Sequence, residues 1–130
     1  MFGKVMNMTR CLVVDPCGKD REQTTALLQD YGFDVFRAAN SEQALSACRT
    51  DMPDMIVVAN SEEPRETPTL LMNLHAAAKR LGRTPVILVC ARDPDPGSIG
   101  SAIIHGANEF IMKPLDGAIL DAKLKQFGLA

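Results

Sequence analysis

Short runs of consecutive apolar residues recur along the chain, and longer segments with helical spacing separate them. The runs cover residues 11–14, 55–59, 85–90 and 110–112. Because they lack polar alternation, they predict strands that are buried on both faces of a sheet. Residues 33–38 instead alternate between apolar and polar side chains, which is typical of an edge strand.

Amphipathic helices are predicted between and after these strands. Gly32 and Gly82 end two of them, and Asn40, Asp95 and Asp116 are the predicted N-caps of three others. The apolar residues that define the helical patterns are Ala26, Leu27, Leu28, Tyr31, Ala44, Leu45, Cys48, Leu70, Leu71, Leu74, Ala77, Ala78, Leu81, Ile99, Ala102, Ile103, Ile119, Leu120, Leu124 and Phe127. Residues 15–20 and 61–68 are predicted loops.

Strand and helix alternate five times, which predicts an α/β fold with one parallel sheet and helices on both faces. At this length we expect the flavodoxin-like strand order 2-1-3-4-5 in a single domain. The domain is predicted over residues 10–130, after a Met-rich lead-in over residues 1–9.

Composition excludes several classes of protein. The net charge of −2 argues against a general nucleic-acid binder, which would carry a basic surplus. No apolar run is long enough to span a membrane, and residues 1–4 do not open a signal-peptide pattern. The 4 cysteines form no Cys-x-x-Cys pair, so we expect a reduced, cytoplasmic setting.

The residues after the central strand offer little chemistry. In parallel α/β sheets, functional groups gather at the carboxyl ends of the strands. Here Ala59, Asn60 and Ser61 occupy that end and provide no carboxylate, thiol or imidazole. Ser61 has no neighbouring base in the sequence, which makes it a poor candidate nucleophile.

Four segments, taken in order, resemble the receiver domain of two-component response regulators. They are residues 13–15, 53–58, 84–91 and 106–114, and the resemblance covers about residues 10–127. It implies a module that accepts a phosphoryl group from a histidine kinase onto an Asp after the third strand. Two acids after the first strand would hold Mg²⁺. A Thr or Ser ending the fourth strand and a Lys ending the fifth would bind phosphoryl oxygens. An aromatic residue in the fifth strand would report the change.

This sequence departs from that pattern at the chemical centre. Asp15 matches the first acid, but Pro16 stands at the second, so we expect Mg²⁺ binding to be weak or absent and no other metal or cofactor. A loop glutamate, Glu62 or Glu63, is either a further oxygen donor or a solvated charge. The phosphoacceptor position falls on Ala59 or on Asn60, depending on the register chosen. Neither residue can form an acyl phosphate.

The other positions match in part. Cys90 replaces the usual Thr or Ser and is either a small buried residue or, with Cys17, part of a redox pair or a soft-metal site. Phe110 matches the aromatic switch position but has no hydroxyl. The Lys113-Pro114 pair matches fully, with a cis peptide bond implied. We expect Lys113 to pair with Asp15 or to hydrogen-bond Asn60, the alternative being a solvated surface lysine.

The sequence therefore predicts a single-domain, non-enzymatic receiver that acts by protein contact, independently of phosphorylation. Its expected partners are a histidine kinase, a phosphotransferase or a downstream target, with no nucleic acid and no membrane. They would bind the face of the fourth helix, fifth strand and fifth helix, which includes Ile99, Ile103, Phe110, Asp116 and Ile119. One alternative is a receiver that still binds a phosphoryl group or another anion. A flavin or nucleotide binder on the same fold is a further alternative, but the chain has no phosphate-binding loop.

Overall fold

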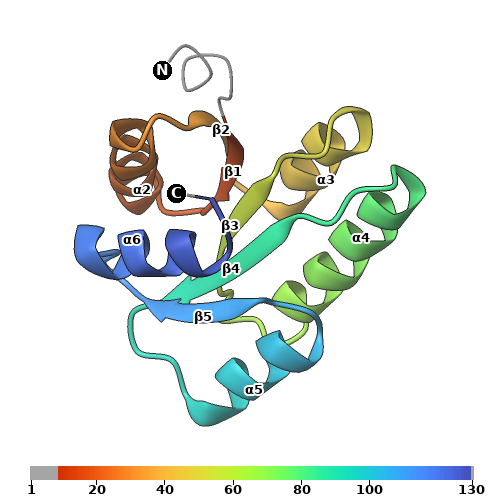
Figure 1. Cartoon of the computed structure of the whole chain (residues 1–130). Coiled ribbons are helices and arrows are strands. Elements are labelled where there is room, and N and C mark those ends of the chain that lie inside the picture. The colour runs from red at the N-terminus through yellow and green to blue at the C-terminus, as the bar shows by residue number, and fades with distance from the viewer. Residues whose placement is uncertain (1–8, 130) are drawn as a thin grey trace.

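A parallel sheet of five strands forms the centre of the molecule (Figure 1). The computed structural model describes residues 9–129. The strands lie in the order β2-β1-β3-β4-β5, as predicted, and are β1 (Arg10–Val14), β2 (Asp34–Ala38), β3 (Met55–Ala59), β4 (Val86–Ala91) and β5 (Glu109–Met112). Except for Thr9, the predicted lead-in over residues 1–9 lies outside the described residues.

Helices cover both faces of the sheet (Figure 1). One face carries α2 (Gly18–Asp30) and α6 (Gly117–Gln126), and the other carries α3 (Ser41–Thr50), α4 (Glu66–Arg80) and α5 (Pro96–Ile104). Successive residues of β3 face opposite layers, so Met55 and Val57 pack in one core cluster and Ile56 and Val58 in the other. In residues 9–129 no helix is long and apolar enough to cross a membrane.

The predicted N-caps of three helices are present. Asn40 accepts a hydrogen bond from the Gln43 amide at 2.8 Å, and Asp95 accepts one from the Ser98 amide at 2.7 Å. Asp116 does the same for the Ala118 amide at 2.7 Å. Each cap satisfies an N–H group that has no partner within its own helix, which fixes where the helix begins.

Two predicted loops were too long. We predicted a loop over residues 15–20, but α2 begins at Gly18, and we predicted one over residues 61–68, but α4 begins at Glu66. Pro68 falls in the first turn of α4, where a missing N–H group costs no helical hydrogen bond.

The inward faces of three helices also differ from the prediction. On α2, Ala26 and Tyr31 are exposed, while Asp20, Thr24 and Leu28 are buried at four-residue spacing. Asp20 is buried on this face because it binds Arg92 and Lys113, so the pattern of apolar residues alone did not identify the face. On α6, Ile119 is exposed, and Leu81 is exposed at the end of α4.

Candidate functional site

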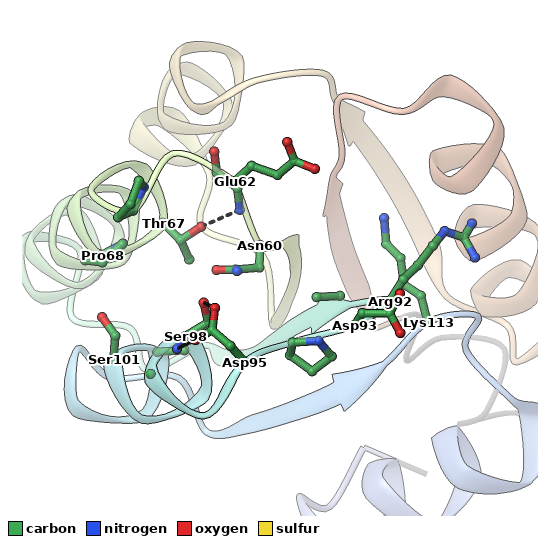
Figure 2. Close-up of a pocket in the computed structure, with 16 residues that line it drawn as sticks. Asn60, Glu62, Thr67, Pro68, Arg92, Asp93, Asp95, Ser98, Ser101 and Lys113 are labelled. Atoms are coloured by element: carbon green, nitrogen blue, oxygen red, sulfur yellow. Dashed lines mark hydrogen bonds between the residues drawn. The ribbon is translucent and has the colours of Figure 1, made fainter.

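The carboxyl ends of the strands border a polar cleft of about 760 Å³ (Figure 2). We call it the carboxyl-end cleft; its lining includes Asn60, Thr67, Arg92, Ser98 and Lys113. It lies between the loop after β3 and the β4–α5 connection with α5, and Arg92 and Lys113 stand at its α2 end. A second, smaller cleft of about 400 Å³ is also lined by Arg92 and Lys113, so these two side chains separate the two spaces.

Lys113 is held by two carboxylates at once. Its Nζ lies 2.8 Å from Oδ2 of Asp15 and 3.0 Å from Oδ2 of Asp20. The predicted pair with Asp15 is therefore confirmed. The alternatives, a hydrogen bond to Asn60 and a solvated lysine, are not what the structure has, since only 10% of the Lys113 side chain is exposed. The peptide bond to Pro114 is cis, as the resemblance implies.

Asp20 and Arg92 are site residues that the sequence did not reveal. Asp20 lies in the first turn of α2 and is buried, with Oδ1 at 2.6 Å from Nη2 of Arg92 and Oδ2 bound to Lys113. The sequence pattern predicts a loop at Asp20. Its spacing of four residues from Thr24, and of eight from Leu28, is the signal that would have placed it on the buried face.

The charges in this network stabilise one another. The hydrogen bond from Lys113 outweighs the effect of burial and, together with the charge of Arg92, lowers the pKa of Asp20. Burial opposes the charge of Lys113, but hydrogen bonds to Asp15 and Asp20 raise the pKa of that lysine overall. Asp20 and Lys113 are therefore both charged at neutral pH.

The acids of the site do not fit a Mg²⁺ ion. Oδ1 of Asp15 accepts a hydrogen bond from the Cys17 amide at 2.9 Å, and Oδ2 binds Lys113. Both oxygens of Asp20 are likewise bound to cations. Mg²⁺ requires carboxylate oxygens that are free to coordinate it. Within residues 9–129 no group of three or more His, Cys, Asp or Glu side chains is arranged to hold a metal.

Strand register favours Ala59 over Asn60 as the match to the phosphoacceptor position. Ala59 pairs with Cys90, which in turn pairs with Ile111, and all three residues pack in the same core cluster. Lys113 follows Ile111 by two residues and so leaves the sheet on the same side. Asn60 faces the other layer and lines the carboxyl-end cleft. Its backbone N–H group donates a hydrogen bond to the Cys90 carbonyl at 2.8 Å.

The remaining candidates have ordinary structural surroundings. Burial raises the pKa of Cys90 to about 12, so this thiol stays protonated, and Cys17 is exposed. Both cysteines are free thiols in the structure. Phe110 is half-buried against the core, and its switch movement stays a prediction.

The loop after β3 provides no activated nucleophile. Oγ of Ser61 accepts a hydrogen bond from the Glu63 amide at 3.0 Å, and the Ser61 amide donates to Oγ1 of Thr67 at 2.9 Å. Glu62 and Glu63 are exposed. The carboxylate of Glu63 accepts a hydrogen bond from the Arg65 amide, within its own loop.

Comparison with known proteins identifies the family. The model of the response regulator receiver domain matches residues 11–125. Protein PilH of Pseudomonas aeruginosa is 26% identical over 113 residues, which are 84% of this chain and 88% of PilH.

Solved structures have the same fold. The chemotaxis protein CheY4 of Vibrio cholerae matches with a TM-score of 0.78 and 21% identity, over 92% of this chain and 98% of CheY4. The receiver domain of Ssk1 from Saccharomyces cerevisiae, crystallised with the histidine phosphotransfer protein Ypd1, matches with a TM-score of 0.80 and 14% identity, over 93% of this chain and 89% of that one. From the family match and the strand order together, this chain belongs to the response regulator receiver domains of two-component signalling.

Proposed function

We propose that this receiver works without phosphorylation, in one fixed state, as a non-enzymatic module that binds other signalling proteins. The observation that carries the proposal is the buried network in which Lys113 is bound by Asp15 and Asp20, in a site whose phosphoacceptor position holds Ala59. A phosphoryl group needs a nucleophile, a charge-neutralising metal and a free cation. Among the described residues, neither Ala59 nor Asn60 is a nucleophile, and the carboxylates of Asp15 and Asp20 are engaged with Lys113.

A surface for partners is available on α5, β5 and α6. Five large apolar side chains are exposed there: Ile99, Ile103, Ile104, Met112 and Ile119. The exposed fraction reaches 81% at Ile104 and 61% at Met112. Single exposed apolar residues are common, but a group on adjacent elements is typical of a protein interface. By analogy with the Ssk1–Ypd1 complex, we propose a phosphotransferase or a histidine kinase as the partner class, with a downstream target as the alternative.

Treatment with a small phosphodonor and Mg²⁺ tests the first part of the proposal. We expect intact-mass spectrometry to show no added phosphoryl group, because no carboxylate is present at Ala59 or Asn60. A receiver domain with an Asp at this position, treated in parallel, shows that the donor is active. A Mg²⁺-dependent mass increase that Ser61→Ala abolishes would instead mean that the chain has recruited another nucleophile.

Substitution on the apolar face tests the second part. We expect Ile104→Glu to weaken binding to a cognate kinase or phosphotransferase domain by about tenfold or more, because it places a charge in an apolar interface. Met72→Glu is the matched control, since Met72 is 58% exposed on α4. Isothermal titration calorimetry with and without phosphodonor should give equal affinities. Unchanged binding by Ile104→Glu together with weakened binding by Met72→Glu would move the interface to another face.

A further inference from the structure

One buried carboxylate binds both cations that face the carboxyl-end cleft. Asp20 contacts Arg92 at 2.6 Å and Lys113 at 3.0 Å, and its side chain is only 8% exposed. The residue comes from α2, whereas Arg92 follows β4 and Lys113 follows β5. The contact therefore joins three segments that are far apart in the sequence at the edge of the site.

The position of Asp20 decides what the two cations can bind. Arg92 and Lys113 line both clefts, but Asp20 lines only the smaller one, next to α2. Figure 2 shows Arg92 and Lys113 next to each other at one end of the carboxyl-end cleft, with Ser98 and Ser101 of α5 at the other end. An anion that entered the cleft from solvent would meet two cations whose charges Asp15 and Asp20 already neutralise.

We propose that Asp20 acts as a built-in anion, which occupies Lys113 and Arg92 and so excludes phosphate and other small oxyanions from the cleft. The inference rests on the proposed function and adds the residue that determines this exclusion. With Asp20 charged, the network of Asp15, Asp20, Lys113 and Arg92 has no net charge. Without the charge of Asp20, the network would have a net charge of plus one, because only Asp15 would oppose Arg92 and Lys113. The guanidinium of Arg92, which can bind an oxyanion through two N–H groups, and the ammonium of Lys113 would then be available to an oxyanion.

Removing the charge of Asp20 without changing its shape tests the proposal. Amide and side-chain NMR spectra of ¹⁵N-labelled wild type and Asp20→Asn would be recorded during titration with inorganic phosphate, at constant ionic strength maintained with chloride. We expect saturable shifts at Arg92 and Lys113 in Asp20→Asn, with an affinity at least tenfold higher than in the wild type. Adding Arg92→Gln should remove most of this gain.

Asp30→Asn is the matched control, because it makes the same change in net charge on the same helix. Asp30 is exposed, lines the smaller cleft and forms no ion pair within residues 9–129. It should behave as the wild type. If Asp20→Asn does not fold, Asp20→Ser removes the charge with a smaller side chain. The proposal is overturned if the folded variant binds phosphate no better than Asp30→Asn, or if phosphate already shifts the Lys113 ammonium resonance saturably in the wild type.

This experiment separates the two proposals. It uses free phosphate without Mg²⁺ or a phosphodonor, so its result does not depend on covalent modification. Phosphoryl uptake by the wild type, with phosphate binding only in Asp20→Asn, would refute the proposed function and leave the role of Asp20 intact. No uptake and no gain in phosphate binding would refute the role of Asp20 alone.

Discussion

Lys113→Met should lower the free energy of unfolding by about 3–5 kcal/mol at neutral pH, because it removes the shared partner of two buried carboxylates. Asp15 and Asp20 have side chains that are only 4% and 8% exposed. Methionine is close to lysine in length, so the loss would come mainly from the charge. Asp20 keeps Arg92, but among the described residues Asp15 keeps only the Cys17 amide as a hydrogen-bond donor to its side chain. Urea denaturation of both proteins measures the difference.

The deficit of Lys113→Met should shrink as the pH falls. In the wild type, the pKa of Asp20 is lowered below its ordinary value of 3.8, so the stabilisation is present above that value and is lost as pH falls through the folded-state pKa. In the variant, the buried carboxylates lose their main counter-charge, and protonation relieves the resulting cost. The pKa of Lys113 is raised above 10.5, so its contribution lasts through neutral pH and is lost only as pH rises through the folded-state value.

Lys125→Met provides the comparison for an exposed ion pair. Lys125 binds Asp121 at 2.9 Å on α6, with side chains 66% and 37% exposed. Water and salt screen such a pair, so its loss should cost less than about 1 kcal/mol. If Lys113→Met cost no more than Lys125→Met, or if its deficit grew in acid, the buried network could not be what fixes the state of this receiver.

The strands of the sheet could be predicted because burial on both faces requires unbroken apolar runs, and the strand order followed from five alternating strands and helices at this chain length. β3 and β4 are unbroken apolar runs, and no helix within residues 9–129 has that pattern. The start of α2 could not be found in this way. Its first turn buries Asp20, a charged residue whose burial is stabilised by Arg92 and Lys113, and both partners are more than 70 positions away.

Some contacts of the candidate site could also be predicted from the sequence, and others could not. The pair of Asp15 and Lys113 was predictable because the resemblance assigns both residues to the carboxyl ends of strands, which lie at the same edge of a parallel sheet. The contact of Arg92 with Asp20 was not predictable, because Arg92 lies in the irregular connection after β4, where no periodicity indicates the direction of a side chain. The sequence therefore showed which chemical groups are missing from the site, whereas the structure was needed to see what has replaced them.

Gly106→Ala should destabilise the fold by about 2–4 kcal/mol, through strain in the left-handed backbone and crowding of a neighbour. Gly106 has a φ of 106° in the turn after α5. A Cβ atom there would lie 2.2 Å from Nε2 of His75 on α4, which forms a 3.0 Å hydrogen bond with the Gly106 carbonyl. Thermal unfolding followed by circular dichroism would measure the loss. The effect matters for function because this turn leads directly into β5, and Lys113 of the site follows the last residue of β5.

Gly100→Ala should have the opposite effect, a gain of about 0.5–1 kcal/mol, because alanine restricts the unfolded chain and suits a helix interior. Gly100 lies within α5, and its added Cβ would have no neighbour within 4 Å.

The double variant His75→Ala/Gly106→Ala separates the two causes of the destabilisation by Gly106→Ala, backbone strain and crowding. Removing the imidazole relieves the crowding but leaves the backbone strain. The double variant should therefore be less destabilised than the sum of the two single variants predicts. Strict additivity would mean that His75 and Gly106 are not in contact and that α4 does not fix the turn before β5.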